Sequence, residues 1–241
     1  MNELIRKFGS KTSLYYKKDS IVGCNSKEDN TDDNARIILA GLSNNLKLEQ
    51  PVSLDKATYN PGIRNVGIGK GVNVEHKKSI QQCKTYSEYF ATPSKGKGES
   101  KQEEKKMVHC MKHIGTIDKV KIVDYEIPLC NRGTALGKGA IDLAFEYDRE
   151  FYIVETKKIN SKESLLRCVL EIETYYETLN KNFDKYSKKV KKGILVDKSS
   201  LPYIHYFDGN HQNVVELMKY YEIDLFELSY VDNQFYIKKV N

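Results

Sequence analysis

Hydrophobic and polar positions alternate most regularly in the second half of the chain. Apolar residues there recur either at every second position, as in a strand, or at three- and four-residue spacing, as in a helix. The elements predicted in order are a helix at 101–114, strands at 117–129, 139–147 and 150–158, a long helix from about Ser161, and a short buried strand at 193–197. This alternation predicts an α/β domain with a sheet flanked by helices.

Beyond residue 197 the pattern predicts a helix at 212–221 and a closing pair of strands. His205 and His211 fall in a segment that we expect to be a turn. The stripe of the long helix is Leu165, Val169, Ile172, Tyr176, Leu179 and Phe183.

The first hundred residues are less regular and predict an α+β extension. Thr31-Asp32-Asp33 is a helix start, and further elements are expected as a strand pair at 15–22 and a helix at 79–90. Glycines dominate residues 51–71, and the Gly67-x-Gly69-x-Gly71 cluster predicts turns rather than a phosphate loop. Small polar residues at 92–101 predict a linker, which divides the chain into regions 1–95 and 96–241.

Composition limits the class of protein. With 39% hydrophobic residues in 241, the chain has enough apolar material for a core, so disorder is excluded as the overall description. No apolar run reaches the roughly 18 residues of a membrane span and no secretory signal follows Met1, so we expect a cytoplasmic protein without a membrane partner. Five cysteines without a C-x-x-C pair predict reduced, buried thiols.

Positive charge is concentrated more than the formal net charge of +6 suggests. Residues 181–192 contain six lysines and one aspartate. This run is either a phosphate-facing surface or a solvated, lysine-rich helix end, and the sequence leaves both open.

The strands at 139–147 and 150–158 bring two acids and a lysine together. A two-residue turn at Asp148-Arg149 would pair Asp142 with Glu155, placing their Cβ atoms about 5 Å apart. Lys157 would share their sheet face, because strand side chains alternate with a period of two.

Opposed carboxylates repel each other unless a cation or a proton joins them. Mg²⁺ suits the pair Asp142 and Glu155, because it takes one or two carboxylates and keeps several waters. The backbone carbonyl of Thr156 is a further candidate ligand, and Lys157 could orient an attacking water or offset charge on a phosphate.

One stretch of the chain resembles the motif of the PD-(D/E)xK nuclease superfamily. It consists of Asp142, twelve further residues and then Glu155-Thr156-Lys157, with Ile141 in place of the motif's proline. The element order at about 101–197 is similar to that superfamily's restriction-endonuclease-like core, a mixed sheet flanked by helices. The resemblance implies that Asp142 and Glu155 bind Mg²⁺ with the Thr156 carbonyl, that Lys157 is catalytic, and that the substrate is a phosphodiester, most often in DNA.

The predicted helix after Lys157 adds to this resemblance. Glu171-x-x-x-Tyr175 is similar to the Gln-x-x-x-Tyr element of the superfamily's exonuclease branch, with Glu in place of Gln, so Glu171 joins the candidate catalytic residues. Arg167 lies on the same side of the helix at four-residue spacing. The candidate nucleic-acid contacts are Arg132, Lys138, Lys158, Arg167 and Tyr175.

Other candidates have an ordinary structural interpretation. Glu126 is either a third acid or a surface glutamate of its strand. His109 and His113, with Cys110 between them, lack a second ligand pair, so we expect a solvated helix face. The 17 tyrosines could stack on bases, but core and edge positions account for them as well.

The sequence therefore predicts a metal-dependent deoxyribonuclease, an endonuclease of restriction or defence type that uses Mg²⁺, with Mn²⁺ as a substitute. RNA is the alternative substrate, and a homodimer would suit cutting of two antiparallel strands. Two other hypotheses stay open: a catalytically inactive nucleic-acid-binding module with the same fold, and an α/β interaction protein whose acids face solvent.

Overall fold

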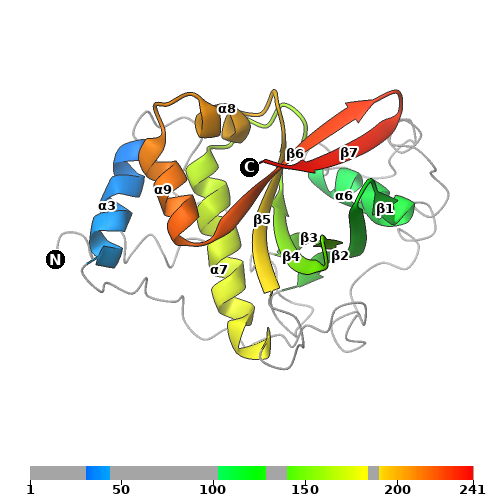
Figure 1. Ribbon diagram of the computed structural model, residues 1–241, viewed down its shortest axis with the longest axis horizontal. Helices are drawn as coiled ribbons and strands as arrows, with labels where there is room; N and C mark the ends of the chain where they lie inside the picture. Colours follow the sequence, from blue (N-terminus) through cyan, green and yellow to red (C-terminus); the bar gives the residue numbers. More distant parts are fainter. Residues whose placement is uncertain (1–30, 44–102, 129–139, 184–189, 241) are drawn as a thin grey trace, which may run out of the picture.

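The computed structural model describes residues 31–43, 103–128, 140–183 and 190–240. These residues form one seven-stranded mixed sheet with helices on both faces, which confirms the expected α/β class (Figure 1). The elements are α3 (Thr31–Ser43), α6 (Glu103–Ile114), β1 (Thr116–Ile117), β2 (Val120–Pro128), β3 (Ala140–Tyr147), β4 (Glu150–Thr156), α7 (Leu165–Phe183), β5 (Val190–Asp197), α8 (Leu201–Phe207), α9 (Gln212–Tyr220), β6 (Ile223–Val231) and β7 (Gln234–Lys239).

Strands lie side by side in the order in which they occur in the chain. Strands β1 to β4 form an antiparallel meander, β4, β5 and β6 run parallel, and β7 returns antiparallel to β6. Parallel neighbours need a crossover connection, and α7 provides the one between β4 and β5. The sheet thus changes from antiparallel to parallel pairing at β4.

Each face of the sheet has its own apolar cluster. Helix α7 covers one face together with α9 and α3, and its Leu165, Val169 and Ile172 are fully buried there as the stripe predicts. Helix α6 covers the other face, where Met107 and Met111 pack against the sheet. Figure 1 shows α3 and α9 outside α7, and α6 across the sheet from them.

The β3–β4 hairpin has the predicted turn and register. Asp148 and Arg149 both adopt positive φ, at 48° and 68°, as a two-residue type I′ turn requires. Pairing then runs from Tyr147 with Glu150 to Leu143 with Val154. In this register, Asp142 and Glu155 are the next residues of the two strands.

Three elements differ from the prediction. The strand expected at 117–129 is divided at Asp118, which has a φ of 50°, so that β1 and β2 form a tight hairpin. Helix α7 begins at Leu165 rather than near Ser161, because the Ser164 hydroxyl accepts the Arg167 N–H at 3.3 Å as an N-cap. Helix α8 occupies the segment that was expected to be a turn.

The predicted helix start at Thr31-Asp32-Asp33 is confirmed, and α3 is joined to the main domain through Asp32. Its carboxylate accepts the backbone N–H groups of Asn213 at 2.8 Å and Val214 at 3.2 Å, in the first turn of α9. Ala35 and Ile38 enter the same apolar cluster as α7. The strand pair at 15–22, the glycine-rich loops at 51–71, the helix at 79–90, the linker at 92–101 and the boundary near residue 95 lie outside the described residues.

Two expectations from composition concern the described residues. Within these ranges no helix combines the length and the apolar character needed to cross a membrane. Cys110 and Cys168 are buried and belong to no disulfide within the described ranges, as predicted for reduced thiols.

Candidate active site

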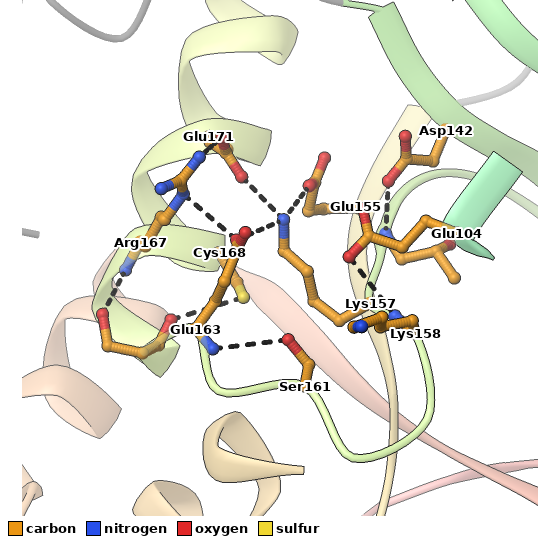
Figure 2. A network of polar contacts seen from close by, with 12 residues as sticks. Glu104, Asp142, Glu155, Lys157, Lys158, Ser161, Glu163, Arg167, Cys168 and Glu171 are labelled. Atoms are coloured by element: carbon orange, nitrogen blue, oxygen red, sulfur yellow. Dashed lines mark hydrogen bonds and ion pairs between the residues drawn. The ribbon is translucent and has the colours of Figure 1, made fainter. Parts of the chain in front are cut away.

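Acidic and basic side chains gather where β4 ends and α7 begins, on the sheet face that α7 covers (Figure 2). Asp142 comes from the start of β3 and Glu155 from the end of β4, and Lys157 directly follows that strand. The other labelled acids are Glu104 from α6, Glu163 from the connecting loop and Glu171 from α7. The structure thus brings Asp142, Glu155, Lys157 and Glu171 into one cluster.

The strands separate at the two predicted metal ligands. The Thr156 N–H donates to Asp142 Oδ2 at 2.9 Å, so a side chain replaces the next hydrogen bond of the β3–β4 ladder. Glu155 is only 4% exposed, and its Oε2 is buried without a hydrogen-bond partner among the described residues. A buried carboxylate oxygen in this state is costly unless something binds it.

Lys157 is 3% exposed and is surrounded by carboxylates. Its ammonium donates hydrogen bonds to Glu155 Oε1 at 2.7 Å and to Glu171 Oε2 at 3.0 Å. Glu163 Oε2 forms an ion pair with the same nitrogen at 2.8 Å. Burial alone would lower the pKa of Lys157, but these carboxylates outweigh it and raise the pKa, so the side chain is a cation.

Arg167 holds two of these acids from α7. Its Nε lies 3.1 Å from Glu163 Oε2, and its Nη2 lies 3.4 Å from Glu171 Oε1. The arginine side chain is 15% exposed, so its guanidinium faces the acids rather than open solvent. Its predicted contact with nucleic acid would require it to leave them.

The loop between β4 and α7 is tied to the end of β5. The Asn160 N–H donates to Asp197 Oδ2 at 2.9 Å, and the Ser161 N–H donates to Ser200 Oγ at 3.1 Å. Ser200 in turn hydrogen-bonds to Asp197. These contacts give the loop that carries Glu163 a defined path beside the site.

Burial and neighbouring charges shift the pKa values of these acids in opposite directions. Burial raises the pKa of Asp142 to about 7, against the lowering effects of Lys157 and the Thr156 N–H. Burial and the Asp142 charge also raise the pKa of Glu155. Burial opposes ionisation of Glu171 as well, but Lys157 and Arg167 dominate and lower its pKa to about 2. Asp142 and Glu155 therefore favour the protonated form, whereas Glu171 is ionised beside Lys157 and Arg167.

The donor set fits a hard divalent cation in part. Asp142 and Glu155 offer carboxylate oxygens, one of them without a hydrogen-bond partner among the described residues, and such oxygens are the ligands that Mg²⁺ prefers. Over the residues that the structure describes, no three His, Cys, Asp or Glu side chains are already arranged to hold a metal ion. Mg²⁺ commonly binds through one or two carboxylates and keeps its waters, so a pair is sufficient.

The residues predicted to contact nucleic acid differ in exposure, and some lie outside the described ranges. Tyr175 is 7% exposed and packs in the core. Burial and the charge of nearby Glu171 raise its pKa, so Tyr175 lies beside the site and not on an open surface. Lys158 is at the surface but forms an ion pair with Glu103 at 2.7 Å. Arg132, Lys138 and the side chain of Glu126 lie outside the description.

The last two lysines of the basic run at 181–192 fit neither a phosphate-facing surface nor a solvated helix end. Helix α7 ends at Phe183, and Lys191 and Lys192 belong to β5. Lys192 is buried against Glu173 at 2.5 Å, and Lys191 lies 2.6 Å from Glu150. These two lysines are therefore neither a solvated helix end nor a free phosphate-binding surface.

The histidines require corrections as well. His109 is 6% exposed and packs edge-on against Tyr125, with ring centroids 4.5 Å apart, and Cys110 is buried beside it. The predicted solvated helix face is wrong for these two residues. His205 lies on α8, is 8% exposed and stacks on His211.

Sequence reasoning missed Glu104 and Glu163. Glu104 approaches from α6, close enough for its charge to raise the pKa of Asp142, and its Oε1 accepts the Lys158 N–H at 3.4 Å. No short-range pattern links it to the strands. Glu163 had a signal, because Glu163, Arg167 and Glu171 follow each other at four-residue spacing.

Comparison with known proteins does not assign a family. No family model and no curated protein matches the chain. Among solved structures, SfsA from Pyrococcus furiosus in complex with Ca²⁺ is similar to 58% of this chain, which spans 62% of that chain's length, at 14% identity and a TM-score of 0.27. A TM-score this low carries no argument about fold or function, so the interpretation of the site depends on its own residues.

Proposed function

We propose that the protein is a metal-dependent nuclease that hydrolyses phosphodiester bonds, with DNA as the preferred substrate. The observation that carries the proposal is the buried Oε2 of Glu155 beside Asp142, which has no hydrogen-bond partner among the described residues, with the Lys157 ammonium on the other oxygen of Glu155. Two neighbouring acids whose raised pKa values reflect the cost of ionising both, beside a buried lysine cation, suit a divalent cation and a phosphate.

The residues take the following roles in this proposal. Asp142 and Glu155 would hold Mg²⁺, or Mn²⁺ in its place, with the Thr156 carbonyl and Glu104 as further candidates. When bound, the metal supplies Lewis-acid activation of a water and neutralises charge on the phosphate. Lys157 offers an N–H donor to the attacking water or to a phosphate oxygen, and Glu171 fixes the lysine's position.

The arrangement of elements supports the same assignment. Helix α6, strands β2 to β4, helix α7 and strand β5 follow in the order expected for a restriction-endonuclease-like core. The two acids lie on neighbouring strands at the position where the ladder ends. Restriction-type or defence-related cleavage, and a dimer with one site per strand, belong to this proposal as well.

A cleavage assay tests the proposal. Linear, circular and single-stranded DNA, and RNA, are incubated with the purified protein in Mg²⁺, Mn²⁺ or EDTA. We expect DNA cleavage with either metal and none with EDTA. Substitution of Asp142→Asn or Lys157→Ala should lower the cleavage rate about 100-fold or more, because each removes a group on which the reaction depends.

Matched controls distinguish loss of function from loss of structure. Asp148→Asn removes an exposed carboxylate from the turn of the same hairpin, and Lys219→Ala removes an exposed ammonium from α9. Both should cleave as the wild type does, and all four variants are checked by thermal unfolding. Absence of cleavage on every substrate with both metals would refute the proposal.

One observation favours an inactive nucleic-acid-binding module as the second candidate. The Lys157 ammonium is engaged by three carboxylates of the described segments, so it has no free position for substrate in this arrangement. Such a module would retain DNA in a salt-dependent manner but show no cleavage for Asp142→Asn to abolish.

A further inference from the structure

Glu163 occupies a position at the candidate site that the proposed reaction does not explain. It lies on the loop between β4 and α7, and its Oε2 is 2.8 Å from the Lys157 ammonium (Figure 2). An ammonium has three N–H donors, and Glu155 and Glu171 accept two of them. Glu163 therefore lies next to the ammonium, where a phosphate or water would approach the remaining donor.

Glu163 is the least constrained of these three acids. Its side chain is 30% exposed, against 5% for Glu155 and 9% for Glu171. Glu155 lies on a strand and Glu171 on a helix, but Glu163 precedes the helix. Its contact with Lys157 is an ion pair without hydrogen-bond geometry. Of the three contacts, this one is the easiest to break.

Arg167 keeps Glu163 paired when that contact breaks. The Glu163 oxygen that faces Lys157 also lies 3.1 Å from Arg167 Nε. A carboxylate that leaves the lysine can thus stay on the arginine, which avoids an uncompensated charge in a half-buried position. Lys157 in turn keeps Glu155 and Glu171 while one donor is freed.

We propose that Glu163 is a positioning residue that competes with substrate phosphate for the Lys157 ammonium, and that it yields this ammonium to the phosphate while staying on Arg167. The inference rests on the proposed nuclease function. It predicts that Glu163 slows the reaction by holding Lys157, whereas a purely structural residue would support it.

Two substitutions distinguish the effect of the Glu163–Lys157 contact from the effect of the Glu163 charge. Glu163→Gln keeps the size of the side chain and removes its charge, and Glu163→Asp keeps the charge but withdraws it from Lys157. Glu216→Gln is the matched control, since it removes an exposed glutamate charge from α9, away from the site. Thermal unfolding confirms that each variant is folded.

The first measurement is the single-turnover rate of DNA cleavage with protein in excess, over a series of Mg²⁺ concentrations. Both Glu163 variants should cleave about five-fold faster than the wild type, the effect of losing one weak, partly exposed ion pair. The Mg²⁺ concentration at half-maximal rate should stay within about two-fold, because Glu163 is not among the proposed metal ligands. Glu216→Gln should match the wild type.

An unchanged or lower rate in folded Glu163→Gln and Glu163→Asp overturns the inference, while cleavage by the wild type leaves the nuclease proposal intact. A faster rate in Glu163→Gln alone also overturns it, because the charge and not the contact would then matter.

The second measurement does not need cleavage. Isothermal titration with inorganic phosphate in Mg²⁺ compares the same variants, and both Glu163 variants should bind phosphate about five-fold more tightly. If the wild type cleaves nothing, the nuclease proposal fails and this titration alone decides the inference: tighter binding in both variants supports it, and equal or weaker binding overturns it.

Discussion

Asp142 and Glu155 are two carboxylates whose charges meet in a site that water reaches only in part. The charge of Asp142 raises the pKa of Glu155, and burial raises the pKa of both. Each acid therefore favours a proton in the absence of a metal. A residue pair that is unfavourable when ionised is suited to an ion that neutralises it.

The raised pKa of Asp142 predicts a pH dependence of stability. Its pKa changes from 3.8 to about 7 on folding, so the folded state binds more protons than the unfolded state between these values. The stabilisation is complete below the lower pKa and is lost as pH rises through the upper one. In EDTA, the free energy of unfolding contributed by Asp142 should fall between about pH 4 and pH 7 and level off above that, as measured by urea denaturation.

Asp142→Asn provides the control, since asparagine does not titrate. Its stability should fall less steeply over the same range, with a remaining slope from Glu155, whose pKa is raised in the same direction. A wild type whose stability is level or increases across this range would contradict the assigned shift.

At the residue scale, the sequence predicted the site residues that come from the β3–β4 hairpin and the position just after it. Asp142, Glu155 and Lys157 follow from strand alternation and one turn. Glu104 comes from the far side of the sheet, and only packing brings it near them. Tyr175 follows Glu171 by one helical turn as the spacing predicts, but it is buried, because a helix embedded between a sheet and other helices buries more than one stripe.

At the scale of elements, the strands and long helices were predictable because each keeps a clear period. Helix α8 was missed because its seven residues, Leu201–Phe207, are almost all apolar or aromatic and show no helical stripe. Its N-terminal signal was present, since Ser200 precedes it and Pro202 lies in its first turn. The hairpin at Asp118 was missed because the residues around it alternate as a continuous strand would.

The link between α3 and α9 predicts that Asp32 contributes more to stability than its neighbour Asp33. Asp32 accepts N–H groups that the first turn of α9 leaves unpaired, whereas Asp33 forms an exposed pair with Arg36 at 3.2 Å. Asp32→Ala should lower the free energy of unfolding by about 1–2 kcal/mol. Asp33→Ala should lower it by less than about 0.5 kcal/mol, and equal losses would argue against the cap.

The two lysines at the start of β5 form a second matched pair. Lys192 is buried with Glu173 and lies 4.6 Å from the centre of the Tyr176 ring, whereas Lys191 pairs with Glu150 at the surface. Removing a buried partner leaves the other charge desolvated. Lys192→Ala should lower the free energy of unfolding by about 3 kcal/mol, and Lys191→Ala by less than about 1 kcal/mol, in chemical denaturation.

At the scale of the whole molecule, the candidate site lies where several parts of the fold meet. The antiparallel meander contributes Asp142, the crossover helix contributes Glu171, and α6 contributes Glu104 from the opposite layer. A ligand that joins these residues would therefore stabilise the entire domain rather than one hairpin.

Metal binding should accordingly raise the stability of the whole protein. At a Mg²⁺ concentration about 100 times the dissociation constant, the free energy of unfolding should rise by about 2.7 kcal/mol. The double variant Asp142→Asn with Glu155→Gln should lose this gain, while Asp148→Asn should keep it. Differential scanning calorimetry at constant ionic strength measures both, and an equal gain in the double variant would place the metal elsewhere.

The two-residue turn at Asp148-Arg149 has a consequence for how this protein can change. Asp148 lies six positions after Asp142, a length of about 20 Å along a strand. One inserted residue in the turn would shift the register by one and send one acid of the pair to the opposite face of the sheet. The residues of this turn can therefore change, but its length of two residues must be kept for Asp142 and Glu155 to remain on the same face at the far end of the hairpin.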